Sequence, residues 1–252
     1  MRRGLAQVQT LPSPGPGFIG EGHTAIHVID AREFTHNDPF IILADDRLDL
    51  PPGRRAGGAH PHAGFEIVTF VVEGEARDRD EGLLRSGDVL WMTAGSGVVH
   101  NAPLRREPGI EARVYSGASG AVHAPSHTYL PMTMVDVQLA PNIVFEQELP
   151  GSYNGFLYPL QGDVLVDGAV TRRLAVGEIG WLEFGGAATT VRLTAGQDGA
   201  RVMLYAGERQ DVPIVTHGPF VGETRADLVR LSQTYLRGEM PRVSELTSTP
   251  SR

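Results

Sequence analysis

The chain has 252 residues, of which 41% are hydrophobic and 21% charged, a composition typical of a globular protein with one large domain or two small ones. Its formal net charge is -8 and its basic residues are scattered, which argues against direct binding to nucleic acid but not against a protein partner. The absence of cysteine excludes disulfides, thiolate catalysis and cysteine metal ligands.

The N-terminal segment MRRGLAQVQT has two arginines but lacks the apolar stretch of a secretory signal. All apolar stretches are far shorter than the roughly 20 residues that a membrane helix needs. We therefore expect no membrane association. A cysteine-free composition also fits a reducing compartment, so we expect a cytoplasmic protein.

The first half of the chain is expected to form short strands separated by turns. These strands cover residues 40–43, 64–72, 75–80 and 89–92. The strand 64–72 is apolar on both faces, which predicts burial on both sides. Turns are expected at Glu81-Gly82 and at Ser86-Gly87-Asp88. Strands at this spacing favour an antiparallel sandwich or barrel over alternating strands and helices.

The second half repeats landmarks of the first half at an offset of about 90 residues, which indicates two copies of one β unit. The matching pairs are Gly64-Phe65 with Gly155-Phe156, Val72–Glu75 with Leu160–Asp163, and Ser86–Trp91 with Val176–Trp181. Because the two tryptophans recur, we assign them to core packing. We place the domains at residues 1–133 and 134–252. A helix is expected to begin at Thr224, with Asp227 in its first turn, and to end near Gly238.

Two histidines stand two residues apart in the segment AHPHAGFE. Residues i and i+2 of a strand point to the same face, so His60 and His62 can converge on one metal ion. His100, after a glycine turn and a short apolar strand, is the candidate third ligand. Imidazole suits Fe, Zn, Cu and Ni better than Mg or Ca. The alternative is a solvated loop at His60 and His62 with a hydrogen-bonded core His100.

The repeat offers an internal control for the metal hypothesis. The positions of the second copy that correspond to the three histidines hold Gly151, Tyr153 and Thr190. A purely structural role would more readily recur in both copies. The loss of all three imidazoles indicates a chemical site in the first copy and a scaffold in the second.

Four stretches of the sequence resemble the pirin family of the cupin superfamily. They are HPHAGFEIVTFVVEGE at 60–75, SGDVLWMTAGSGVVH at 86–100, the C-terminal Thr216–Val221 and Asn37–Phe40. The resemblance implies an all-β bicupin, two antiparallel jelly-roll-like β-barrels with a short C-terminal helix. It also implies Fe(II), with Ni, Zn, Cu or Mn as alternatives, bound in the N-terminal barrel only.

The family's metal ligands fall on His60, His62 and His100, but its fourth ligand, a glutamate, falls on Ala102. Without that negative charge the metal affinity should fall. Glu66 is a candidate replacement, because many cupins place a carboxylate near this position and 60, 62 and 66 share a face on an unbroken strand. A bulge at Gly64 would spoil that arrangement. The alternative for Glu66 is a hydrogen-bonded acid that lines the barrel.

The resemblance leaves three functions open. The first is a quercetin (flavonol) 2,3-dioxygenase, with a small aromatic substrate in an apolar barrel and Glu66 as its base. The second is a metal-dependent regulatory or transcription-cofactor-like module that binds a protein partner. The third is a cupin that has lost its metal, which Ala102 favours.

Overall fold

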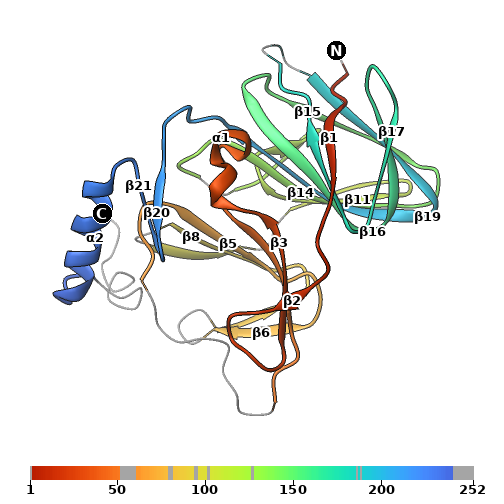
Figure 1. Cartoon of the computed structure of the whole chain (residues 1–252). Coiled ribbons are helices and arrows are strands. Elements are labelled where there is room, and N and C mark those ends of the chain that lie inside the picture. Colours follow the sequence, from red (N-terminus) through yellow and green to blue (C-terminus); the bar gives the residue numbers. More distant parts are fainter. Residues whose placement is uncertain are drawn as a thin grey trace. The chain divides into compact units, whose positions relative to one another are not determined.

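The computed structural model describes residues 2–51, 61–78, 82–93, 96–100, 103–125, 128–185, 187 and 189–240, with the backbone alone at 78, 93 and 96–100. More of the described chain lies in strands than in any other structure, and it ends in one helix of three turns, as expected (Figure 1). It forms two compact units, residues 1–56 with 102–211 and residues 57–101 with 212–252. In the part of the chain described, no helix has the length and apolarity that crossing a bilayer requires.

The described residues of the first unit form fourteen strands and two short helical turns. The strands are β1 (Leu5–Thr10), β2 (Gly15–Pro16), β3 (His23–Ile29), β4 (Leu43–Leu48), β10 (Leu104–Glu107), β11 (Ile110–Ser116), β12 (Ala118–Ser119), β13 (Val122–His123), β14 (Met132–Leu139), β15 (Val144–Leu149), β16 (Tyr153–Asp167), β17 (Arg172–Ala175), β18 (Glu178–Leu182) and β19 (Thr189–Glu208). The turns are η1 (Ala31–Glu33) and α1 (Phe34–Asn37).

A nine-stranded antiparallel sheet dominates this unit, in the order β1-β18-β16-β19-β14-β11-β10, with β15 on β19 and β17 on β16. In the described residues no sheet closes on itself, so the expected barrels are open at the level of backbone hydrogen bonds. Because β11 and β14 are neighbours in this sheet, strands from both sides of residue 133 share one layer. The domain boundary at 133/134 stays a prediction.

One face of this sheet encloses an aliphatic core. Its fully buried members include Val135, Val137, Leu157, Val191 and Leu204. Successive residues of a strand point to opposite faces, which is why Asp136 lies on the other side from Val135 and Val137. The cluster is formed mainly by aliphatic residues, and the buried Gln147 lies on the same face of β15 as the core residues Phe145 and Leu149.

The expected strand at Phe40–Leu43 is wrong: the strand here is β4, Leu43–Leu48. The amide of Phe40 instead donates to the carbonyl of Asn37, and its ring packs edge-on against Phe156. Asp38, two residues before Phe40, is 2% exposed and accepts hydrogen bonds from the amides of Gln210 and Asp211. The segment 37–40 is therefore attached by hydrogen bonds to the residues that follow β19.

In the second unit, the part of the chain that the structure describes forms seven strands and the C-terminal helix. They are β5 (Glu66–Phe70), β6 (Glu75–Asp78), β7 (Gly82–Arg85), β8 (Val89–Thr93), β9 (Ser96–His100), β20 (Val215–His217), β21 (Phe220–Gly222) and α2 (Arg225–Leu236). Strands β5, β8 and β9 form one sheet, β6 pairs with β7, and β20 pairs with β21 (Figure 1).

The C-terminal helix begins and ends as the sequence predicts. Thr224 caps it, the side chains of Thr224 and Asp227 form a reciprocal capping box, and Gly238 follows with a positive φ of 71°. Hydrogen bonds from Thr224, and then from Arg230, lower the pKa of the Asp227 carboxyl. The ring of Phe220 on β21 lies 6.3 Å from that of Tyr235, which joins the helix to the strand.

Candidate metal centre

The four predicted site residues are described to different degrees. His62 and Glu66 are described in full, His100 through its backbone, and His60 lies outside the described residues, as does Ala102. Among the side chains that the structure describes, no group of three or more histidine, aspartate or glutamate residues is arranged to hold a metal. The convergence of the three imidazoles therefore stays a prediction.

The segment between His62 and Glu66 is fixed by a strand from the far end of the sequence. Ala63 forms a parallel bridge with Phe220, and the amide of Val221 donates to the carbonyl of Ala63 at 3.1 Å. Gly64 has a φ of 92°, and a Cβ atom there would lie 2.2 Å from the carbonyl oxygen of Val221. Only glycine fits this close approach.

The same glycine interrupts the strand. Strand β5 begins at Glu66 rather than at the expected residue 64, and the left-handed backbone at Gly64 ends the regular alternation of faces. The expectation that positions 60, 62 and 66 share one face required an unbroken strand. The placement of His62 relative to Glu66 is therefore set by the Gly64 turn and by β21, not by strand alternation.

The imidazole of His62 is held by its surroundings. The ring of Phe65 packs edge-on against it, with 5.7 Å between centroids and an interplanar angle of 88°. The Nδ1 atom of His62 is buried, while the residue as a whole is half-buried. An ordered, partly accessible imidazole of this kind suits a metal ligand.

Glu66 accepts a hydrogen bond from the indole of Trp91. The Nε1 atom of Trp91 lies 3.1 Å from Oε1 of Glu66. Trp91 is 6% exposed and Trp181 is 3% exposed, which confirms the packing role predicted for both. The bond to Glu66 was missed. Part of its signal was available, because a buried indole N–H needs an acceptor, but the choice of Glu66 follows from the pairing of β5 with β8.

The strand register places His100 and Glu66 in different rows of the three-stranded sheet. Glu66 pairs with Thr93, which pairs with Ser96, whereas Phe70 pairs with Val89, which pairs with His100. Four residues of strand span about 13 Å. The backbones of Glu66 and His100 thus lie at opposite ends of the sheet, and the structure does not bring these two positions together.

A second polar cluster lies in the first unit, on the face of the large sheet opposite the aliphatic core. Asp136 and Arg201 form a bidentate ion pair, with 2.7 Å between Nη2 and Oδ2. The hydroxyl of Tyr158 donates to Asp45 at 2.7 Å. Burial, and then the bond to Asp45, raises the pKa of the Tyr158 phenol, and burial followed by Asp136 raises that of Tyr205. The sequence reasoning did not anticipate this cluster.

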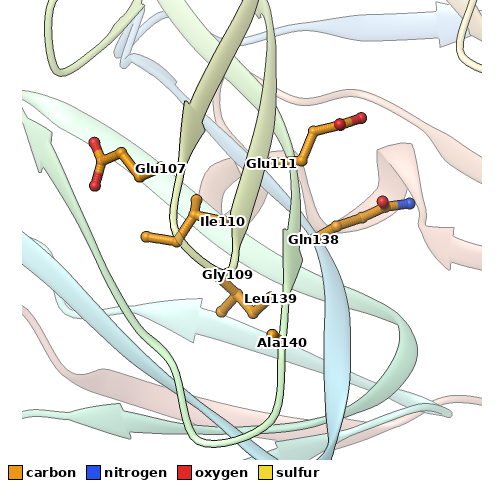
Figure 2. A pocket seen from close by; sticks show the side chains of 7 residues that line it. All are labelled: Glu107, Gly109, Ile110, Glu111, Gln138, Leu139 and Ala140. Atoms are coloured by element: carbon orange, nitrogen blue, oxygen red, sulfur yellow. The ribbon is translucent and has the colours of Figure 1, made fainter.

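An open pocket of about 410 Å³ lies where the β10–β11 turn meets the end of β14 (Figure 2). Its lining residues are Glu107, Gly109, Ile110, Glu111, Gln138, Leu139 and Ala140. Both carboxylates are engaged by arginines, Glu107 by Arg105 and Glu111 by Arg106. None of the predicted site residues lines this pocket, so it is separate from the candidate metal centre.

The donor chemistry of the candidate set fits a transition metal. Imidazole nitrogens with one carboxylate suit Fe(II), Ni, Zn, Cu or Mn better than Mg or Ca, which prefer oxygen-rich sets. The described part of the set, His62 and Glu66 on either side of a glycine turn, supplies one donor of each kind. This fit rests on the chemistry of the side chains.

Comparison with known families matches most of the chain. The family pattern described as Pirin covers residues 24–123, and the pattern described as Pirin C-terminal cupin domain covers residues 134–241. A protein of Pseudomonas aeruginosa with a provisional name of quercetin 2,3-dioxygenase is 27% identical, over 82% of this chain and 88% of its own length.

Two solved structures share the fold. A protein from Geobacillus kaustophilus is 31% identical and aligns with a TM-score of 0.73 over 84% of this chain and 99% of its own. A structure of quercetin 2,3-dioxygenase from Acinetobacter baumannii is 22% identical and aligns with a TM-score of 0.80 over 96% and 100%. Together with the two family patterns, they confirm the expected all-β bicupin with a C-terminal helix.

Proposed function

This chain belongs to the pirin family, and from that premise we propose that it is a metal-binding bicupin that cleaves flavonols such as quercetin with O₂. The metal-bearing domain comprises residues 1–133, and residues 134–252 form the second domain. The substrate is a small aromatic molecule with a hydroxyl group next to a ring carbonyl. The provisional name of the Pseudomonas aeruginosa relative supports this choice of reaction.

The main support for the proposal is the segment from His62 to Glu66, whose backbone and side chains are held in place by neighbouring residues. An imidazole packed by Phe65 and a carboxylate bonded to Trp91 flank a glycine whose backbone approach to Val221 admits no side chain. Such support of candidate ligands is what a preorganised site requires. The positions of the second copy that correspond to the three histidines hold Gly151, Tyr153 and Thr190, which supports a single site per chain.

In this proposal His60 and His62 hold Fe(II), and His100 or Glu66, the latter in place of the family's glutamate at Ala102, completes the protein ligands; the register makes these two alternatives, since they lie at opposite ends of the sheet. Bound Fe(II) would supply redox chemistry toward O₂ and a Lewis-acid contact for the substrate's 3-hydroxyl group. The carboxylate of Glu66 would accept the proton of that hydroxyl. Because Glu66 and His100 lie in different rows of the sheet, their contributions must be measured separately.

Metal analysis of the purified, untagged protein tests the site. Wild-type protein should carry near-stoichiometric Fe, Ni or Zn, and His62→Ala should lose it. His217→Ala is the matched control, because His217 is an exposed histidine in the same unit and is not assigned to the site. Equal metal content in His62→Ala and wild type would reject the metal centre. Individual Glu66→Ala and His100→Ala variants assign the remaining ligands.

Oxygen uptake tests the reaction. Iron-loaded protein given quercetin should consume O₂ in proportion to the quercetin that disappears, and His62→Ala should not. If the iron-loaded protein consumes no O₂ with quercetin, the dioxygenase function is rejected and the second candidate function remains. That candidate is a metal-dependent module for a protein partner, which the net charge of -8 suits better than a nucleic-acid partner.

A further inference from the structure

We propose that Trp91 is a positioning residue for the metal centre, which fixes the carboxylate of Glu66 through its indole N–H. The inference rests on the proposed function, because it takes Glu66 as a metal ligand or base. It assigns Trp91 a role beyond the packing that its burial already explains. The bond in question joins Nε1 of Trp91 to Oε1 of Glu66 at 3.1 Å.

The strand register accounts for the contact. Val68 on β5 lies directly opposite Trp91 on β8, and Glu66 lies opposite Thr93. Directly opposed residues, and residues two apart on one strand, share a face of the sheet. Glu66 and Trp91 are therefore diagonal neighbours on one face, a separation that a long aromatic side chain spans. The contact therefore follows from the pairing of two regular strands.

The burial of the two partners differs in a way that favours a role for the bond in the site. Trp91 is 6% exposed, so its N–H needs an acceptor inside the protein. Glu66 is half-buried and could be solvated without this bond. A hydrogen bond to a carboxylate is shorter and stronger than one to a neutral group, so the indole orients the acid effectively.

The second copy of the repeat keeps the tryptophan and loses the acid. The shared Gly-Phe pair is followed by Glu66 in the first copy and by Leu157 in the second, where Leu157 is fully buried. Trp181 lies opposite Phe156, with 5.1 Å between their ring centroids. The tryptophan of the second copy thus packs on an aromatic ring, whereas the tryptophan of the copy with the histidines contacts a carboxylate.

A double-substitution cycle tests the inference, with Ni²⁺ titrated into metal-free full-length protein by calorimetry. Trp91→Phe keeps an aromatic ring but removes the N–H, and should weaken Ni²⁺ binding by about tenfold or more, as the loss of such supporting bonds does. Glu66→Ala should weaken it as well. If Trp91 acts through Glu66, the double variant should bind Ni²⁺ no more weakly than Glu66→Ala alone.

Trp181→Phe is the matched control, because it makes the same change at a buried tryptophan that faces Phe156 instead of a carboxylate. It should leave Ni²⁺ affinity unchanged. The inference would be overturned if the losses of Ni²⁺ affinity multiplied in the double variant, or if Trp91→Phe and Trp181→Phe lost equal affinity. Either result would show that Trp91 acts through general stability.

A second measurement keeps Trp91 in place and so does not depend on the folding of Trp91→Phe. In Trp181→Phe, Trp91 is the chain's one tryptophan, and Ni²⁺ should quench its fluorescence saturably, with the midpoint found by calorimetry. Absence of quenching while Ni²⁺ binds would place Glu66 outside the metal centre and sink the inference. If wild-type protein binds no Ni²⁺, Fe²⁺ or Zn²⁺ at all, the proposed function itself fails.

Discussion

Asp88 and Glu178 make the same hydrogen bond in the two copies of the repeat. The carboxylate of Asp88 accepts from the amide of Arg85 at 2.8 Å, and that of Glu178 accepts from the amide of Ala175 at 2.9 Å. In each copy the residue before the acid is a glycine with a φ near 87–88°. The duplication inferred from sequence is therefore also a duplication of backbone conformation.

The surrounding bonds repeat as well. The amide of Ser86 donates to the carbonyl of Gly74 at 3.0 Å, and the amide of Val176 donates to that of Gly162 at 3.4 Å. Replacement of either acid by alanine should lower the free energy of unfolding by about 1 kcal/mol, since each loses one hydrogen bond of the same geometry. Chemical unfolding of the single variants Asp88→Ala and Glu178→Ala checks this. Clearly unequal losses would show that the two turns are not equivalent.

Gly64→Ala should destabilise the protein and weaken metal binding. The new Cβ would meet the carbonyl oxygen of Val221 at 2.2 Å, in addition to the backbone strain of a positive φ. Gly74→Ala is the matched control, because Gly74 has a similar φ of 86° but no atom within 4 Å of the added Cβ. Thermal unfolding should show a larger loss for Gly64→Ala, and equal losses would argue against the close approach of Val221.

Ala102→Glu should tighten binding of divalent metal. A carboxylate at the position of the family's fourth ligand would add negative charge to a set dominated by neutral imidazoles. Calorimetric titration with Ni²⁺ should show at least a tenfold gain in affinity over wild type, whereas the neutral Ala102→Gln should gain less. Unaltered affinity in Ala102→Glu would mean that Glu66 or another group already fills the role.

The buried phenols predict a loss of stability in alkali. Burial raises the pKa of Tyr158 and Tyr205 above that of an unfolded tyrosine, near 10. The contribution of these two phenols to the free energy of unfolding is complete below pH 10. It falls as pH rises above 10, because the unfolded chain then releases protons that the folded chain keeps. Each phenol should cost up to about 1.4 kcal/mol per pH unit between pH 10 and 12. Urea unfolding of Tyr158→Phe should show a shallower decline than wild type.

The buried hydrogen bonds of Asp38 predict that its substitution lowers the stability of the protein without a direct effect on the candidate metal centre. Asp38→Ala would leave the amides of Gln210 and Asp211 without their buried acceptor, and should lower the free energy of unfolding by about 2 kcal/mol. Glu21→Ala, at an exposed position of the same unit, should cost far less. Equal midpoints of chemical unfolding for Asp38→Ala and Glu21→Ala would contradict the stabilising role assigned to Asp38.

Local signals explain what the sequence predicted well. The start of α2 follows from Thr224 and Asp227, which are three residues apart and interact within one turn. The repeat follows from glycines that each copy needs at the same tight turns. The spacing of His60 and His62, two residues apart, also makes them candidate ligands, and this stays a prediction because His60 lies outside the described residues.

Long-range contacts explain what could not be predicted. The bridge from Ala63 to Phe220 joins residues from opposite ends of the chain, and no pattern near either residue encodes it. The register that pairs His100 with Val89 is likewise set by backbone hydrogen bonds. Phe40 has the apolar character of a strand residue, yet it packs its ring on Phe156 and lies outside β4. In each case tertiary packing overrides local preference.

The bond from Val221 to Ala63 has a consequence for the order of events during synthesis. While the ribosome is still translating, the segment with His62 and Glu66 has emerged but its partner strand has not. The segment acquires its support only when nearly the whole chain has been made. If the segment binds metal as proposed, a nascent chain stalled before residue 215, which lacks β20 and β21, should bind that metal more weakly than the finished protein.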